Sequence, residues 1–166
     1  MKKNIIEKAK RIKVVLTDVD GVLTDGGMYY SEKGDIMKKF HARDGMGVTL
    51  LLKIGIPTII VTKEKNMIIK QWAKKMKISK LFDGVLKKED ITQKILKKFN
   101  VSLNEIAYIG DDINDVELLK KIGFSAAPND CILETKEICD YICNKNGGNA
   151  AFREFVDVII SSKKVK

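Results

Sequence analysis

The chain has 166 residues, of which 45% are hydrophobic, and this is enough for the core of one domain and argues against long disordered regions. Its net charge of +9 comes from basic residues scattered in pairs without interleaved aromatic residues. This pattern is typical of solvated helix faces and not of a nucleic-acid surface, although a positive field would attract a phosphorylated substrate. Three cysteines without a C-x-x-C spacing argue against a disulfide framework or a zinc site, and no apolar run approaches a membrane span or a signal peptide, so we expect a cytoplasmic protein.

Short apolar runs alternate with helical patterns along the chain. The β-branched runs bounded by turn residues predict buried strands at residues 14–16, 58–62, 81–85, 106–109, 124–127 and 141–143. Apolar stripes of helical period predict helices at residues 44–54, with Asp44 as N-cap, and at 66–76, 90–99, 116–122 and 150–160. This alternation predicts a three-layer α/β fold of Rossmann type, in which helices cover both faces of a mostly parallel sheet, as a single domain over residues 1–166.

Polar residues follow four successive strands of this predicted sheet. In chain order they are Asp18, Asp20, Thr62, Lys87, Lys88, Asp111, Asp112 and Asp115. Ligands of such sheets bind just beyond the carboxyl ends of the strands. We therefore expect these side chains to meet at one edge of the sheet.

This set of side chains suits phosphoryl transfer. Clustered carboxylates cannot all stay ionised without a cation, and oxygen ligands favour Mg²⁺ over zinc. One carboxylate can attack phosphorus, a second can exchange the proton of the leaving oxygen, and a lysine and a threonine can hold the transferring oxygens. Each piece alone has an ordinary interpretation, such as a D-x-D turn or a helix N-cap with a charged first turn. The ordered set at successive strand ends predicts phosphoryl chemistry.

Several segments resemble known motifs. Residues 18–26 (DVDGVLTDG), Thr62, Lys88 and residues 110–115 (GDDIND) resemble the four motifs of the haloacid dehalogenase superfamily. Residues 41–45 (HARDG) and 147–154 (GGNAAFRE) resemble signatures of its capless branch, whose phosphatases act on 3-deoxy-D-manno-octulosonate 8-phosphate or on nonulosonate 9-phosphates. The resemblance extends from about residue 14 to residue 160.

The resemblance implies a role for each matching residue. Asp18 is expected to be the nucleophile and Asp20 the general acid and base, while Asp18, the backbone carbonyl of Asp20 and Asp111 are expected to bind Mg²⁺. Thr62 and Lys88 would grip the phosphoryl group.

Three further residues have less direct roles in this comparison. Asp112 is expected to orient Lys88 or a metal-bound water. Asp115 is a weaker candidate for a residue that holds other site residues in place. Lys87 is an adjacent rival for the lysine role. Lys88 is preferred because the family lysine lies four residues past the glycine after the third strand, here Gly84.

The chain leaves no room for a cap domain over this site. Residues 28–30 and 36–40 flank a glycine-containing loop and predict a hairpin, which is either an ordinary surface hairpin or an assembly element. The resemblance implies a homotetramer in which neighbouring copies close each site. Arg43 is expected to bind substrate, and the loop at 147–148 and Arg153 are candidates for closing a neighbour's site, although Arg153 could equally be a surface helix residue.

Glu64 suggests which sugar acid is used. Octulosonate enzymes of the resembling branch typically read Thr-Gly-Arg where this chain reads Thr62-Lys63-Glu64, and nonulosonate enzymes carry Glu at the last position. An arginine attracts a substrate carboxylate, whereas a glutamate repels it and must face neutral donors. We therefore expect a nonulosonate 9-phosphate as substrate, with octulosonate 8-phosphate as the alternative. Glu64 could instead be a first-turn helix residue favoured by the helix dipole.

Other functional classes fit less well. A signalling receiver domain also forms an aspartyl phosphate, but its acidic pair and its phospho-acceptor lie on different strands. A non-catalytic or sugar-binding module would be expected to have lost part of the charged set. A phosphomutase would need a cap to hold its diphosphorylated intermediate.

Overall fold

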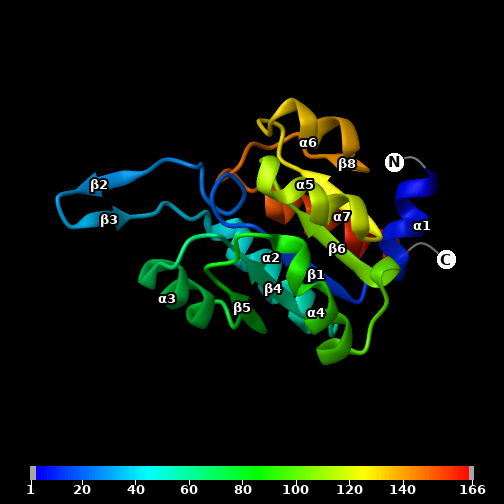
Figure 1. Ribbon diagram of the computed structural model, residues 1–166. Helices are drawn as coiled ribbons and strands as arrows, with labels where there is room; N and C mark the ends of the chain where they lie inside the picture. The colour runs from blue at the N-terminus through cyan, green and yellow to red at the C-terminus, as the bar shows by residue number, and fades with distance from the viewer. Residues whose placement is uncertain (1–2, 165–166) are drawn as a thin grey trace.

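The computed structural model describes residues 3–164 and contains a six-stranded sheet in the order β5-β4-β1-β6-β7-β8. Every neighbouring pair in this sheet is parallel. The strands are β1 (Val14–Thr17), β4 (Thr58–Val61), β5 (Lys80–Phe82), β6 (Ile106–Ile109), β7 (Phe124–Ala127) and β8 (Tyr141–Ile142). The α/β fold predicted from the alternation of elements is confirmed (Figure 1).

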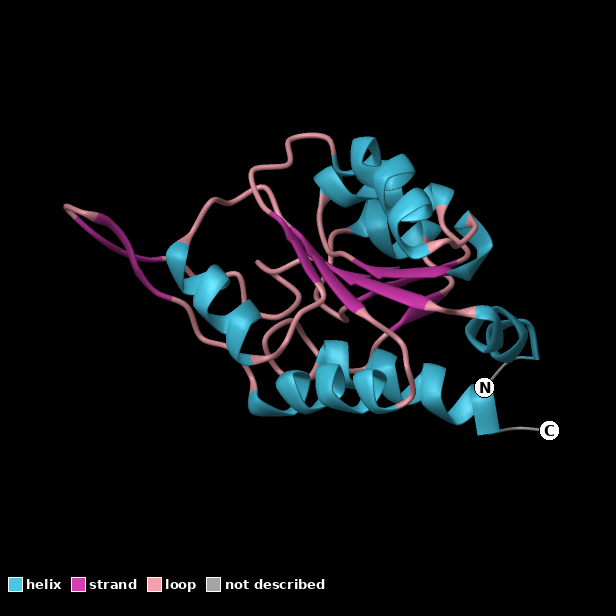
Figure 2. Cartoon of the chain, turned by 90° about the horizontal axis from the view of Figure 1, so that it is seen from below, coloured by secondary structure: helices cyan, strands magenta, loops and turns pink. Residues whose placement is uncertain are grey.

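Helices cover both faces of the sheet, as Figure 2 shows. One face packs against α1 (Lys3–Arg11), α2 (Ala42–Lys53), α3 (Met67–Lys75) and α7 (Ala151–Lys164). The other packs against α4 (Thr92–Phe99), α5 (Val116–Lys121) and α6 (Leu133–Ile138). Successive side chains of a strand point to opposite faces, so Val15 of β1 belongs to the first core whereas Val14 and Leu16 belong to the second.

A two-stranded antiparallel hairpin, β2 (Tyr29–Ser31) and β3 (Gly34–Met37), projects from the body of the protein (Figure 1). Its apolar side chains are exposed, among them Tyr30 and Ile36. At its base, Phe40 stacks on Trp72 of α3 with ring centroids 4.7 Å apart. This hairpin is the only insertion near the strand ends within residues 3–164, and these residues contain no cap domain.

Some local predictions need correction. The N-cap of α2 is His41, whose Nδ1 accepts the Arg43 N–H, and Asp44 lies buried inside the first turn. Strand β5 ends at Phe82 because Gly84 adopts a φ of +69°, which breaks the extended backbone. Helices α1 and α6 were not predicted, since α1 is mostly polar and α6 spans only 6 residues. None of the helices between residues 3 and 164 is both long and apolar enough to cross a membrane.

Candidate active site

The polar residues expected at one edge of the sheet do meet there. Asp18 follows the central strand β1, Thr62 follows β4 on one side, and Asp111 lies just after β6 on the other. The chain passes from β1 to β4 and β5 and then returns to β6, so the order reverses between β1 and β6. Such a reversal opens a crevice at the carboxyl ends of the strands.

The carboxylates of Asp18, Asp111 and Asp115 form a compact cluster. One oxygen from each lies within 4.8 Å of the others. Burial raises the pKa of Asp18 and Asp111 well above the usual range, and the neighbouring carboxylates raise both further. Among residues 3–164, Asp111 Oδ1 is buried without a hydrogen-bond partner. A hard cation with oxygen ligands fits this arrangement, because it would offset the repulsion and occupy the free oxygen.

Lys88 lies inside the cluster. Its Nζ is 2.9 Å from Asp18 Oδ1 and 2.5 Å from Asp115 Oδ1, and its side chain has no solvent exposure. Lys87, the rival considered above, is exposed and precedes the 3₁₀ turn Lys88–Ile91. The structure thus brings Lys88, and not Lys87, to the nucleophile candidate.

The residue that holds Lys88 is Asp115. Of the two roles expected for Asp112, orienting Lys88 is wrong, because the carboxylates that contact this lysine are those of Asp18 and Asp115, and orienting a metal-bound water stays a prediction. Asp115 Oδ1 accepts from Lys88 and from the buried Tyr108 hydroxyl, while its Oδ2 accepts the N–H groups of Asp111 and Asp112 at 2.9 and 3.2 Å. The reason is the 3₁₀ turn Ile113–Asp115, which turns Asp115 inward and leaves Asp112 exposed as its N-cap. Because both Asp115 oxygens are occupied, Asp18 and Asp111 are the better ligands for a cation.

The loop after β1 requires small residues. A Cβ built on Gly21, where φ is +88°, would lie 1.9 Å from Asp111 Oδ2. A Cβ on Gly147 would lie 1.9 Å from the Gly21 carbonyl oxygen, and the Gly148 N–H donates to the Val22 carbonyl at 2.9 Å. The loop at 147–148, expected to act on a neighbouring copy, therefore packs on the nucleophile loop of its own chain.

Asp20 is held by two donors on the same oxygen. Asp20 Oδ1 accepts from Thr24 Oγ1 at 3.2 Å and from Lys38 Nζ at 2.7 Å. Lys38 also lies 3.1 Å from Asp35 Oδ2. Burial alone would lower the pKa of Lys38, but the two carboxylates outweigh this effect and raise it above its ordinary value. Lys38 was not predicted as a site residue. The one feature of the sequence that could have indicated it is a lysine within the predicted hairpin.

These residues open onto a cleft of about 170 Å³. The cleft is lined by Asp18, Asp20, Gly26, Met28, Lys38, Thr62, Lys63, Glu64, Asp112 and Asn114. Thr62 Oγ1 accepts the Glu64 N–H at 3.2 Å, so its own proton can be donated to a bound group. Thr62 and Glu64 thus line the same cleft as Asp18.

Arg43 and Arg153 are not brought to this cleft. They line a different cavity together with Glu154 and Asp157, and Arg153 Nε pairs with Asp157 at 2.9 Å. The reason is that Arg43 lies in the first turn of α2 and Arg153 in that of α7, and these two helices pack on each other. The expected contact of Arg43 with substrate is therefore not made within its own chain, and the two alternatives for Arg153, a neighbour's site or the helix surface, stay open.

Comparison with known proteins agrees with this geometry. Residues 58–154 match the family of haloacid dehalogenase-like hydrolases. The 3-deoxy-D-manno-octulosonate 8-phosphate phosphatase KdsC of Haemophilus influenzae is 35% identical over 157 residues, which are 95% of this chain and 87% of that protein. KdsC of Escherichia coli K12 is 32% identical, with coverage of 95% and 84%.

Solved structures agree as well. The 3-deoxy-D-manno-octulosonate 8-phosphate phosphatase of Moraxella catarrhalis, in complex with magnesium ion, phosphate ion and KDO, superposes with a TM-score of 0.94 at 34% identity, covering 98% of this chain and 94% of that one. The cobalt-bound Haemophilus influenzae enzyme gives a TM-score of 0.92 at 35% identity, covering 94% and 91%. The chain therefore belongs to the family of haloacid dehalogenase-like hydrolases, and the relatives from Haemophilus influenzae and Escherichia coli described above are phosphatases.

Proposed function

We propose that this protein is a Mg²⁺-dependent phosphatase that removes phosphate from a small sugar acid through an aspartyl phosphate on Asp18. The observation that carries the proposal is the position of the Asp18 carboxylate in the cleft, beside the buried Lys88 ammonium and the carboxylate of Asp111. The magnesium-bound and cobalt-bound relatives support the choice of a divalent cation.

In the first half of the reaction, a carboxylate oxygen of Asp18 attacks phosphorus and the bond from phosphorus to the sugar oxygen breaks. Asp20 donates its proton to that leaving oxygen. Lys88 and the Thr62 hydroxyl face the charge of the transferring oxygens. Mg²⁺ held by Asp18, the Asp20 carbonyl and Asp111 would supply further positive charge.

In the second half, Asp20 takes a proton from a water molecule that attacks phosphorus, and inorganic phosphate leaves. The Asp18 carboxylate is regenerated, and Asp20 again carries the proton for the next cycle. Asp115 keeps Lys88 and the Asp111 backbone in place throughout, because its two oxygens bind both.

For the substrate we propose 3-deoxy-D-manno-octulosonate 8-phosphate. Named relatives with this activity cover 95% of the chain at 31–35% identity. They favour this sugar acid over the nonulosonate that Glu64 suggested. Nonulosonate 9-phosphate remains a second candidate because Glu64 does line the cleft, where its charge would oppose a substrate carboxylate.

The substrate assay compares kcat/KM for the two sugar acid phosphates in the Mg²⁺-loaded protein. We expect a higher value for the octulosonate. A higher value for the nonulosonate, reduced specifically by Glu64→Ala, would establish the second candidate. Glu117→Ala is the matched control, since Glu117 is an exposed glutamate of α5 outside the cleft. A folded, Mg²⁺-loaded protein that hydrolyses neither ester would overturn the proposed function.

We also propose that the protein assembles as a homotetramer in which neighbouring copies cover the cleft. The support is the exposed apolar surface of the hairpin, where Met28 and Tyr30 are 62% and 63% exposed. Arg43 and Arg153 lie outside the cleft of their own chain. If they contact substrate, it would therefore be substrate bound in the cleft of a neighbouring copy.

A further inference from the structure

Lys38 is buried where the hairpin joins the body of the protein. It follows β3, and its side chain is only 2% exposed. Burying an ammonium group is costly unless it is paired. Lys38 meets this condition by contacting two carboxylates, Asp20 Oδ1 at 2.7 Å and Asp35 Oδ2 at 3.1 Å.

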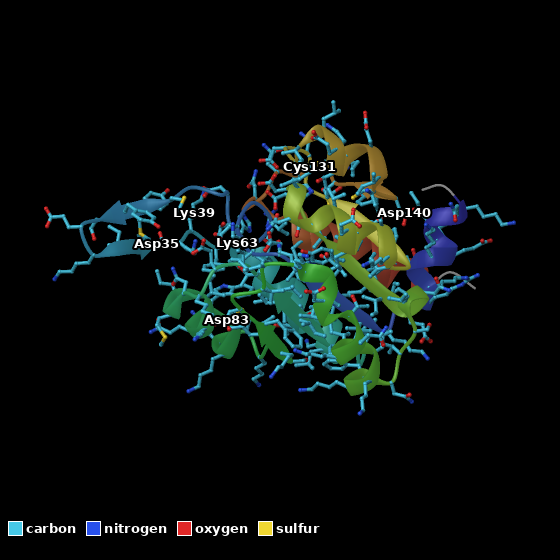
Figure 3. The ribbon with its side chains drawn as sticks, viewed as in Figure 1. Asp35, Lys39, Lys63, Asp83, Cys131 and Asp140 are labelled. Atoms are coloured by element: carbon cyan, nitrogen blue, oxygen red, sulfur yellow. The ribbon has the colours of Figure 1, made fainter. Side chains whose placement is uncertain are left out.

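Asp35, the second carboxylate that Lys38 contacts, is itself hydrogen-bonded to the body of the protein. Asp35 Oδ2 also accepts from Asn66 Nδ2 at 2.9 Å, and Asn66 is the N-cap of α3, where its Oδ1 accepts the Ile68 N–H. Figure 3 shows Asp35 on the hairpin. A continuous set of contacts therefore runs from the start of α3 through Asp35 and Lys38 to Asp20.

The two carboxylate oxygens of Asp20 differ in their hydrogen bonds. Oδ1 receives both Thr24 and Lys38, whereas Oδ2 is buried and has no hydrogen-bond partner among residues 3–164. A carboxyl group that exchanges a proton with substrate needs one oxygen fixed and the other free. Two donors on Oδ1 restrain the rotation of the carboxyl group and leave Oδ2 free of competing hydrogen bonds within the described residues.

We propose that Lys38 is a positioning residue that holds the Asp20 carboxyl group in the orientation required for proton transfer, so that the hairpin is a working part of the active site. This inference rests on the proposed phosphatase function. Lys38 acts through Asp20, and its contribution therefore depends on how much a substrate needs its leaving oxygen protonated.

Lys39 provides a matched control. It is the neighbouring lysine, which Figure 3 labels. It also pairs with an aspartate, Asp25 Oδ2 at 3.0 Å, and its side chain is 61% exposed. An exposed pair of this kind contributes little to stability, and Lys39 does not line the cleft. Loss of Lys39 removes the same charge from the same segment without touching Asp20.

The experiment compares Lys38→Met, Lys38→Arg and Lys39→Met with two esters, octulosonate 8-phosphate and p-nitrophenyl phosphate. The alkyl leaving group needs a proton, whereas nitrophenolate leaves without one, and kcat/KM reports the steps up to that departure. We expect Lys38→Met to lower kcat/KM for the sugar ester roughly ten- to hundredfold more than for the aryl ester, part of the usual general-acid contribution. Lys38→Arg should recover part of the loss, and Lys39→Met should change neither value.

A double mutant separates positioning from anchoring of the fold. In an Asp20→Asn background, Lys38→Met should have no further effect on the sugar ester, because the group that it positions is gone. The double-mutant comparison shows whether Lys38 acts through Asp20 even if the aryl ester is a poor substrate. Asp35→Asn, which weakens the same set of contacts, should act in the same direction if Lys38→Met does not fold.

Equal losses on both esters together with additive effects in the Asp20→Asn background would overturn the inference, since Lys38 would then only anchor the hairpin. An inactive wild-type protein would instead refute the proposed function. An active wild-type protein that lacks this pattern contradicts the role of Lys38 alone.

Discussion

Lys88 Nζ lies 2.5 Å from Asp115 Oδ1, and neither side chain has any solvent exposure. The same Asp115 carboxylate accepts the Tyr108 hydroxyl and the N–H groups of Asp111 and Asp112. It thus links the strand β6, the loop that carries Asp111, and the lysine that contacts Asp18. Asp115 therefore positions both the lysine and the loop that carries Asp111.

Replacement of Asp115 should therefore damage both the fold and the reaction. Asp115→Ala leaves the buried Lys88 ammonium with Asp18 as its remaining carboxylate partner. It also removes the acceptor of the Tyr108 hydroxyl and of two backbone N–H groups. We expect a loss of about 3–5 kcal/mol in the free energy of unfolding, measured by urea denaturation, and a large loss of activity. Glu117→Ala, which removes an exposed carboxylate paired with Lys120, should change stability by less than about 0.5 kcal/mol. An unchanged urea midpoint for Asp115→Ala would show that Lys88 does not depend on it.

Asp18→Asn tests the covalent step. The substitution keeps the shape of the side chain and removes the attacking charge, so kcat should fall by several orders of magnitude. The fold should persist, because Lys88 retains Asp115 as a partner. The measurement is phosphate release by a variant whose thermal unfolding and Mg²⁺ binding have been checked. Near-normal turnover in such a protein would rule out a nucleophilic Asp18.

The carboxylate cluster predicts a requirement for metal. Chelation should abolish activity and Mg²⁺ should restore it, whereas Ca²⁺ should restore it poorly because of its larger and looser coordination. A readout independent of turnover is the melting temperature, which should rise with Mg²⁺ in the wild type and much less in Asp111→Asn. Full activity after exhaustive chelation, or equal thermal shifts in both proteins, would count against the site.

Asp44 should make stability depend on pH. Burial raises its pKa from 3.8 to about 6 in the folded protein, where Asp44 Oδ1 accepts the Arg153 N–H and Oδ2 has no partner within the described part of the chain. As pH rises, the unfolded chain releases this proton first. The Asp44 contribution to stability is therefore greatest below about pH 4, falls up to about pH 6, and is constant above that, with a total change of at most ~3 kcal/mol.

The check is a comparison with Asp44→Asn, which stays neutral at every pH. The free energy of unfolding of the variant, measured by urea denaturation, should increase relative to that of the wild type between about pH 4 and about pH 6. Titration of the active-site carboxylates is common to both proteins and cancels in this difference. A difference that does not change with pH would mean that Asp44 titrates normally.

The proposed tetramer predicts that the hairpin is an interface. A charge placed at the exposed Ile36 should dissociate the assembly and depress activity together, because the cleft would lose its cover. Sedimentation of Ile36→Glu measures the first effect and kcat/KM the second. Leu133→Glu on α6 is the control, because Leu133 is 66% exposed, against 59% for Ile36, and lies far along the chain from the hairpin. A fully active wild-type monomer would show that no neighbour is needed.

The alternation of strands and helices, the mostly parallel direction of the strands and the polar residues at their ends were predicted from the sequence alone. The spans 106–109 and 124–127 were predicted to the residue, because turn-forming residues bound them, Gly110 after the first and Gly123 and Pro128 around the second. Asp18, Thr62 and Asp111 could be placed at one edge because the carboxyl ends of parallel strands must coincide.

Two features depended on contacts between distant residues and could be seen only in the folded chain. Asp115 and not Asp112 meets Lys88, because one 3₁₀ turn decides which of two nearby carboxylates points inward. Lys38 reaches Asp20 from 18 residues away, across a hairpin whose pattern shows only alternation and a turn. Periodicity specifies which face a residue occupies within its own element, whereas the partner of a buried charge depends on how separate elements pack.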